Sequence, residues 1–289
     1  MEALLHQLAS GLANGCLYAC LALALVMIYQ ATHHINFAQG EMAVFSTYLA
    51  ATAINAGLPY WLAFAGTIAF TFASGALIHR VFIRPVEKAP VLSSVAIFIS
   101  LLVIFNSLAG WIWGFTSRTF PSPFEKLTWG GRYLGGHELG LVLVTSIVLA
   151  LVFAFFRFTS TGLAMRAAAQ NRTSSQLVGI PVNAMLGLGW GLAAALGSVA
   201  GMMAAPLLYL DPNMMSGLLL YGFAGALLGG ISSPGGAVVG GIVLGLAENL
   251  AGAYLVGTEL KLVFALAVIV LVLFVRPAGL FGRRTVVRV

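Results

Sequence analysis

Long stretches without a charged residue constrain this chain more than any other feature of its sequence. Only 8% of its 289 residues are Asp, Glu, Lys or Arg, whereas a soluble protein carries about 25%. A helix needs about 20 consecutive apolar residues to cross a bilayer. The uncharged stretches that approach or exceed this length are 3–40, 42–79, 89–117, 139–156, 173–210 and 212–247. The sequence therefore predicts a membrane protein and excludes a soluble enzyme, a disordered chain and a disulfide scaffold.

The apolar runs favour transmembrane helices over the strands of a β-barrel, because barrel strands alternate apolar and polar residues. The run 141–156 shows no such alternation. We expect an all-α, polytopic bundle of about eight or nine transmembrane helices, folded as one domain over residues 1–289. The predicted spans are about 8–29, 38–56, 60–79, 91–113, 139–157, 183–208, 215–231, 236–254 and 260–275.

Glycine, proline and short polar residues mark the ends of several spans. Ala56-Gly57-Leu58-Pro59 should end the second span, because proline cannot continue a helix interior. Asp211-Pro212-Asn213 predicts a turn. Ser232-Ser233-Pro234-Gly235-Gly236 interrupts another run, as either a short loop or a helix break at membrane depth.

The basic residues predict the orientation of the chain, because cytoplasmic loops carry an excess of Lys and Arg. Three basic segments contain Arg80, Arg84, Lys88, Arg157, Arg166, Arg172, Arg276, Arg283, Arg284 and Arg288. If all three are cytoplasmic, the C-terminus is inside, and the N-terminus and the loops 116–138 and 209–215 are outside. Nine crossings satisfy this arrangement, whereas eight require one re-entrant segment and a shifted boundary. The first span should be retained, because no Lys or Arg precedes it as in a signal peptide.

The sequence lacks the motifs of several common catalytic and metal sites. No Lys follows a Gly, which excludes a Walker-type phosphate loop, and neither His-Glu-x-x-His nor Cys-x-x-Cys occurs. We therefore expect no catalytic residue, no metal and no cofactor. The net charge of +6 comes from residues between the spans, so no nucleic-acid partner is expected.

A four-residue glycine spacing recurs in the second half of the chain. Helices in lipid associate through close packing, which small residues permit. The spacing therefore predicts tight helix contacts, and it leaves open whether those helices also slide or rock. The pairs are Gly197/Gly201, Gly225/Gly229, Gly236/Gly240 and Gly241/Gly245.

Two groups of polar residues fall within or beside the predicted spans. Asn36, Gln39 and Glu41 open the second span, and Glu248 and Asn249 lie inside the eighth. Ionisable groups at membrane depth are costly and commonly functional. These groups could bind a zwitterion, line a water-filled path or join two helices. Glu41 also suits a helix start, and Glu248 also suits an interhelical hydrogen bond.

The segment 157–182 is longer than a plain connector needs to be. Residues 163–169 favour a helix, and Gly179 and Pro181 should end one helix and start the next. We expect a short cytoplasmic helix pair with basic and small faces. It would dock on a cytoplasmic partner or lie on anionic lipid.

A set of short motifs is spread along the whole chain. The motifs are Gly15-x-x-Tyr18-Ala19, Ile35-Asn36-Phe37-Ala38-Gln39-Gly40-Glu41, Arg84-Pro85, the loop Gly162 to Gly179, Gly229-Gly230-Ile231, Pro234-Gly235-Gly236-Ala237, Gly240-Gly241, Glu248 and Arg276-Pro277-Ala278-Gly279-Leu280-Phe281-Gly282. Together they resemble the permease subunits of ABC importers for branched-chain amino acids (LivH-type), and the resemblance runs essentially end to end.

The resemblance implies a multi-pass protein of the bacterial inner membrane with the ABC importer permease fold. It implies a second homologous permease, two cytoplasmic ATP-binding subunits and an extracytoplasmic substrate-binding protein as partners. Substrate would pass by alternating access, with Asn36, Gln39, Glu41, Glu248 and Asn249 as the candidate pathway. The candidate coupling residues, within 157–182, are Gly162, Arg166, Asn171 and Gly179.

The cargo stays open, because relatives of this family carry branched-chain and other amino acids, amides or small carboxylates. A stand-alone, ion-coupled secondary transporter is the alternative, with Glu41 and Glu248 as ion sites. A membrane-bound enzyme has no supporting constellation of residues in the sequence.

Overall fold

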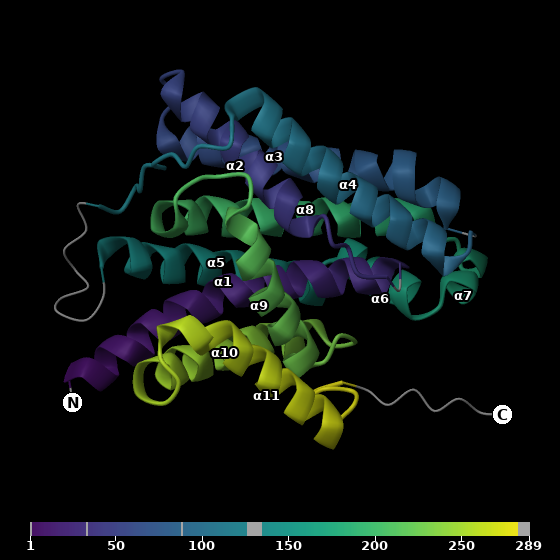
Figure 1. The fold of residues 1–289 in the computed structure, drawn as a ribbon. Coiled ribbons are helices and arrows are strands. Elements are labelled where there is room, and N and C mark those ends of the chain that lie inside the picture. Colours follow the sequence, from purple (N-terminus) through teal and green to yellow (C-terminus); the bar gives the residue numbers. More distant parts are fainter. Residues whose placement is uncertain (1, 33, 88, 126–134, 283–289) are drawn as a thin grey trace. The chain divides into compact units, whose positions relative to one another are not determined.

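The computed structural model describes residues 2–32, 34–87, 89–125 and 135–282 (Figure 1). Lys88, Arg283, Arg284 and Arg288, which contribute to the predicted orientation, lie outside these residues. The long helices are α1 (Glu2–Thr32), α2 (Gln39–Asn55), α3 (Tyr60–Ile78), α4 (Val91–Trp113), α5 (Gly136–Phe158), α8 (Val182–Leu208), α9 (Met214–Gly229), α10 (Pro234–Tyr254) and α11 (Lys261–Val275). The shorter elements are α6 (Ser160–Gln170), α7 (Arg172–Leu177), the π-helix η1 (His79–Ile83) and the 3₁₀ turns η2 (Arg84–Val86) and η3 (Thr258–Leu260).

Each of the nine predicted spans corresponds to a helix, so the helical membrane-protein fold is confirmed. Among the described residues, seven helical segments are long and apolar enough to cross a membrane. They are Glu2–Thr32, Tyr60–Val86, Val91–Trp113, Gly136–Phe158, Val182–Leu208, Pro234–Tyr254 and Thr258–Val275. The apolar α9 and the 17-residue α2 are shorter.

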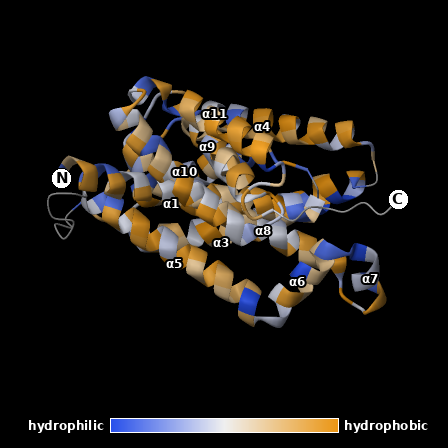
Figure 2. Ribbon diagram, turned by 90° about the horizontal axis from the view of Figure 1, so that it is seen from below, coloured by the Kyte–Doolittle hydropathy of each residue, from blue (hydrophilic) through white to orange (hydrophobic). Residues whose placement is uncertain are grey.

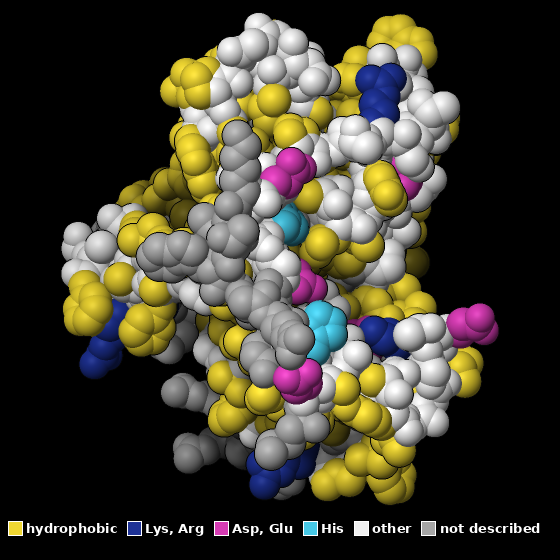
Figure 3. Space-filling view, turned by 90° about the vertical axis from the view of Figure 1, so that its left-hand side faces the viewer, with side chains coloured by type: hydrophobic (Ala, Val, Ile, Leu, Met, Phe, Trp, Pro, Cys, Tyr) yellow, Lys and Arg dark blue, Asp and Glu magenta, His cyan; other side chains and the backbone are white. Residues whose placement is uncertain are grey.

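Hydrophobic side chains also cover much of the surface of the long helices. Trp111 on α4 and Phe274 on α11 are among the most exposed large hydrophobic residues that the structure describes. In Figure 2 the long helices are orange over most of their length, whereas α6 and α7 carry blue, hydrophilic residues. On the face drawn in Figure 3, charged side chains lie scattered among hydrophobic ones. Such a surface suits a lipid environment.

The predicted turns form as their residues require. Gly57 has a φ of +96°, and Pro59 caps α3. Asp211 Oδ1 accepts a hydrogen bond of 2.7 Å from the backbone N–H of Asn213. Ser233 Oγ caps α10 by accepting a bond of 3.1 Å from Gly236 N–H, and Pro234 is the first helical residue. The interruption is therefore a short loop at 230–233, and residues 234–236 already belong to α10.

The chain packs as two compact units. The first unit comprises residues 1–26, 122–145 and 217–289, and the second comprises residues 27–121 and 146–216. The single domain expected over 1–289 stays a prediction.

In the first unit, α10 packs directly on α1 and α9 through the predicted glycine positions. A Cβ atom on Gly241 would lie 2.5 Å from Ala19 N, and one on Gly225 would lie 2.7 Å from Gly241 Cα. Gly11 lies against Leu246. Because position 11 pairs with 246 and position 19 with 241, α1 and α10 are antiparallel.

The Gly-Leu-Phe-Gly tail completes the end of α9 in the same unit. The backbone N–H groups of Leu280 and Phe281 donate to the carbonyls of Leu228 and Gly229, each at 2.9 Å. The last carbonyls of a helix lack intrahelical partners, so the tail satisfies two of them. Gly230, with a φ of +108°, allows this close approach.

In the second unit, α8 is the central helix, and α2, α3 and α6 pack on it. Gly75 on α3 lies against Ala194, and Gly187 lies beside His79, so α3 and α8 are antiparallel. A Cβ on Gly201 would lie 2.5 Å from Thr47 Oγ1 on α2. The predicted tight contacts at Gly197/Gly201 are therefore confirmed.

Candidate functional site

Helix α2 begins beside the middle of α8, and not beside either end of α8. Gln39, its first residue, donates from Nε2 to the carbonyl of Ala193 at 2.8 Å. Ala193 lies eleven residues after Val182, which at about 1.5 Å per residue is roughly 16 Å along α8. Further along, Thr47 lies against Gly201, so α2 runs parallel to α8.

The backbone before α2 is irregular, and the protein satisfies it locally. Asn36 and Gln39 are fully buried. Asn36 Oδ1 accepts a hydrogen bond of 3.0 Å from Ala38 N–H. Non-helical backbone at membrane depth is tolerated only where protein buries it or where it lines a cavity. Asn36 thus holds the chain at the start of α2, while Gln39 Oε1 has no hydrogen-bond partner among the described residues.

Glu41 forms a polar cluster with Asn106, which was not predicted from the sequence, and with the predicted turn at 211–213. Its Oε2 accepts a hydrogen bond of 3.2 Å from Asn106 Nδ2 on α4. Asn106 Nδ2 also lies 3.1 Å from the carbonyl of Pro212 and 3.0 Å from Asn213 Oδ1. The available signal was a single amide within the apolar run of α4.

Glu248 and Asn249 form a second cluster, within the first unit. Tyr18 on α1 donates its hydroxyl to Glu248 Oε2 at 2.8 Å. Lys261, the first residue of α11, places Nζ 3.9 Å from Glu248 Oε1 and 3.0 Å from Asn249 Oδ1. Asn249 Nδ2 donates to the Gln7 carbonyl at 2.7 Å. The cluster therefore joins α1, α10 and α11.

These contacts favour the interhelical alternative for Glu248. Neither Lys261 nor Gln7 was predicted from the sequence as a partner of this cluster. Glu41 and Glu248 belong to different units, so the five candidate pathway residues form two separately described clusters.

The predicted helix pair is confirmed in 157–182. Thr159 Oγ1 caps α6 by accepting from Gly162 N–H at 3.0 Å, and Asn171 Oδ1 caps α7 by accepting from Ser174 N–H at 3.0 Å. A Cβ on Gly162 would lie 2.7 Å from Phe156 Cα, so this position requires glycine for the sharp entry into α6. Gly179, with a φ of +83°, turns the chain toward α8.

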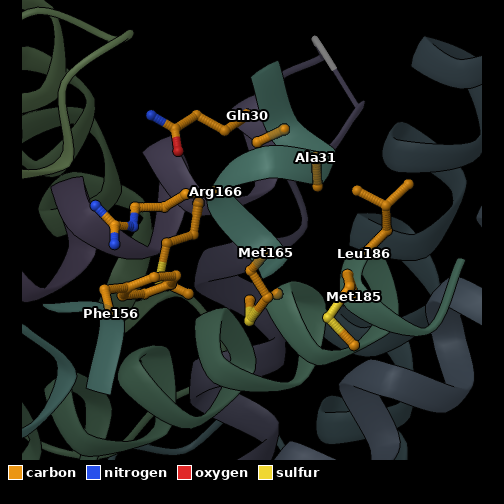
Figure 4. Close-up of a pocket in the computed structure, with 10 residues that line it drawn as sticks. Gln30, Ala31, Phe156, Met165, Arg166, Met185 and Leu186 are labelled. Atoms are coloured by element: carbon orange, nitrogen blue, oxygen red, sulfur yellow. The ribbon is translucent and has the colours of Figure 1, made fainter. Parts of the chain in front are cut away.

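Arg166, the remaining candidate coupling residue, lines a small pocket beside α6. Figure 4 shows Gln30 and Arg166 on one side of this pocket and Met185 and Leu186 on the other. Its volume is about 30 Å³, which suits one or two water molecules. An amino acid does not fit, so this pocket is not a substrate site in the conformation described.

The comparisons with known proteins give a consistent family. Residues 7–273 match the family described as "Branched-chain amino acid transport system / permease component". The chain is 31% identical to the high-affinity branched-chain amino acid transport system permease protein LivH of Escherichia coli, over 99% of this chain and 97% of that protein. It is also 31% identical to the permease protein BraD of Pseudomonas aeruginosa, over 99% and 98%.

A solved structure supports the fold alone. PsaBC from Streptococcus pneumoniae, in complex with Fab, superimposes with a TM-score of 0.51 at 14% identity, covering 92% of this chain and 90% of that one. The resemblance inferred from the motifs is confirmed by the family match and the two nearly full-length relatives. This chain belongs to the permease components of branched-chain amino acid transport systems.

Proposed function

We propose that this chain is the membrane subunit of an ATP-driven importer that translocates branched-chain or other small amino acids by alternating access. The match to LivH and BraD over nearly the whole length of each protein carries this proposal. A second homologous permease, two cytoplasmic ATP-binding subunits and an extracytoplasmic binding protein complete the transporter. A related importer for an amide or a small carboxylate is the alternative cargo assignment.

We propose nine crossings, with the N-terminus outside and the C-terminus cytoplasmic, and the helix directions support this order of spans. In a chain of nine alternating spans, the first and eighth spans run in opposite directions. The antiparallel packing of α1 and α10 agrees with this order. Omitting any one of the spans between them would make the two helices parallel. The predicted cytoplasmic segments, rich in Arg, agree with the same orientation.

The substrate path is proposed to pass the start of α2. Asn36, Gln39 and Glu41 surround a helix start buried beside the middle of α8, and Gln39 offers an unused acceptor. In membrane transporters, interrupted helices at this depth commonly form binding sites. Small residues along α8, including Gly197 and Gly201, would allow α2 to separate from it and close again.

The proposed transporter can be tested by extracting the tagged chain gently from its native membrane and identifying what remains bound. We expect a second permease and ATP-binding subunits in mass spectrometry, together with ATPase activity stimulated by a substrate-loaded binding protein. A chain that purifies alone and transports in liposomes without ATP would contradict the proposal. Leucine, isoleucine and valine should compete for uptake if the cargo is a branched-chain amino acid.

The helix pair is proposed to dock on an ATP-binding subunit through its apolar tip. Leu177, the last residue of α7, and Val178, which follows it, have exposed fractions of 84% and 76%. We expect Leu177→Asp to reduce the ATP-binding subunit recovered with the permease by about tenfold or more, because a buried charge without a partner is costly at an interface. Thr173→Asp, exposed on the same helix, is the matched control and should retain the subunit. Equal recovery from both variants would contradict the proposed docking site.

A further inference from the structure

Arg172 connects the helix pair to two other elements of the second unit. It is the first residue of α7. Its Nη1 forms an ion pair with the carboxylate of Glu87, and its Nη2 donates to the backbone carbonyl of Ala31. These partners lie far from Arg172 in sequence, one just after η2 and the other in the last turn of α1.

The chemistry of both contacts suits a guanidinium group. Carbonyls in the last turn of a helix lack intrahelical partners, and a cation is favourable at that end of the helix dipole. Arginine presents several donors in a fixed planar fork, so one side chain can hold a carbonyl and a carboxylate together. Arg172 thereby fixes α7 against the end of α1 and against the segment that continues α3.

The backbone provides α7 with a different connection. Gly179 and Pro181 lead from α7 directly to α8, and α6 lies on the other side of α7 in sequence. A six-residue helix is too short to hold its own orientation without tertiary contacts. A displacement of α7 would therefore move α8 through the connecting chain, and the contacts of Arg172 would in addition transmit it directly to the end of α1 and to Glu87 after η2.

The ion pair between Arg172 and Glu87 should affect the movement of the helices more than the folding stability of the permease. The side chains of Arg172 and Glu87 retain exposed fractions of 32% and 25%. Partly exposed ion pairs contribute little to folding stability, because solvent screens them. Removing this ion pair should consequently leave the permease folded and inserted.

We propose that Arg172 is a positioning residue that fastens the helix pair to α1 and to the segment after α3, so that these helices move together with α8 when the pair is displaced. This inference rests on the proposed coupling role of the helix pair. It assigns to Arg172 and Glu87 the transmission of movement, and not the docking of the ATP-binding subunit.

The test compares Arg172→Ala, Arg172→Lys and the control Arg157→Ala in the complex extracted from its native membrane. Arg157 is an exposed arginine near the end of α5, so its loss changes the net charge equally. We expect Arg172→Ala to retain the inserted permease, the bound ATP-binding subunits and the basal ATPase rate. Substrate-stimulated ATPase and transport should fall at least about fivefold, the lower end of typical coupling effects between sites. Arg172→Lys should be intermediate, and Arg157→Ala should match the unmodified protein.

The exchange of the two charges gives an independent measurement. In the double variant Arg172→Glu with Glu87→Arg, the ion pair can form again, but a carboxylate cannot donate to the Ala31 carbonyl. We expect partial recovery of stimulation relative to Arg172→Glu alone. Should Arg172→Ala fail to insert, Glu87→Gln carries the test, because it removes the charge pair and leaves the contact with α1.

The outcomes separate this inference from the proposed function. Full stimulation in both Arg172→Ala and Glu87→Gln would overturn the role of Arg172 and leave the importer assignment intact. Loss of the ATP-binding subunits from Arg172→Ala would show a docking role and would also overturn the inference. An unmodified chain that binds no ATP-binding subunit would instead overturn the proposed function.

Discussion

Replacing Gly241 with leucine should strongly destabilise the packing of α1 on α10 in the first unit. A Cβ atom at this position would lie 2.5 Å from Ala19 N and 2.6 Å from Ala19 Cα, both in the backbone of α1. Backbone atoms cannot rotate away as a flexible side chain does, so α1 and α10 would have to separate. Overpacking a core commonly costs about 1–3 kcal/mol, and we expect at least the upper end of that range here.

The effect can be measured as the amount of permease that remains monodisperse after extraction and mild heating. Gly235→Leu is the matched control, because it places the same side chain on the same helix, where a Cβ would meet no atom within 4 Å. We expect normal recovery for Gly235→Leu and little for Gly241→Leu. Similar recovery of the two variants would show that α1 and α10 do not pack through Gly241.

Local sequence signals predicted most of the fold because each depends on neighbouring residues. Hydropathy located all nine long helices of the described part of the chain, and the cap and turn residues around 157–182 predicted the helix pair. The GxxxG spacing predicted which helix faces approach closely. The glycine spacing could not predict which helix each face contacts, because Gly241 packs on Ala19 and Gly201 packs on Thr47, which lie far away in sequence.

The candidate site was predicted less completely, because its geometry depends on tertiary contacts. Hydropathy placed the start of the second span within one residue of Gln39, but it carries no information about depth. The contacts of Gln39 with Ala193 and Gly197 show that this helix start lies beside the middle of α8. Similarly, counting charges along the chain pairs Lys261 with Glu259, whereas the fold brings Lys261 to Glu248 and Asn249.

Replacing Glu248 with alanine is expected to destabilise the permease by about 2–3 kcal/mol. Glu248 is 3% exposed and accepts a hydrogen bond from the Tyr18 hydroxyl, so its loss leaves Tyr18 without this acceptor and Lys261 without its countercharge. Breaking a fully buried ion pair costs about 3–5 kcal/mol. The cost here is lower because the Lys261 side chain retains 23% exposure and can extend toward the interface.

The measurement is the thermal unfolding of Glu248→Ala, Lys261→Met and the double variant in the same detergent. If the two residues stabilise the fold as a pair, the double variant should lose less stability than the sum of the single variants. Additive losses would contradict the pairing. Lys261→Met alone should cost less than Glu248→Ala, because it leaves the Tyr18–Glu248 hydrogen bond in place.

Glu248→Gln separates the structural role of Glu248 from a role in ion-coupled transport. Glutamine keeps an acceptor for Tyr18 and has nearly the same shape, but it cannot bind or release a proton at this position. If the cluster joins α1, α10 and α11, the variant should transport normally once its inserted amount is taken into account. An ion-coupled secondary transporter that uses Glu248 would instead lose uptake while keeping its unfolding temperature. Since Glu41 lies in the other unit, Glu41→Gln can be assayed in parallel to ask the same question of the cluster at the start of α2.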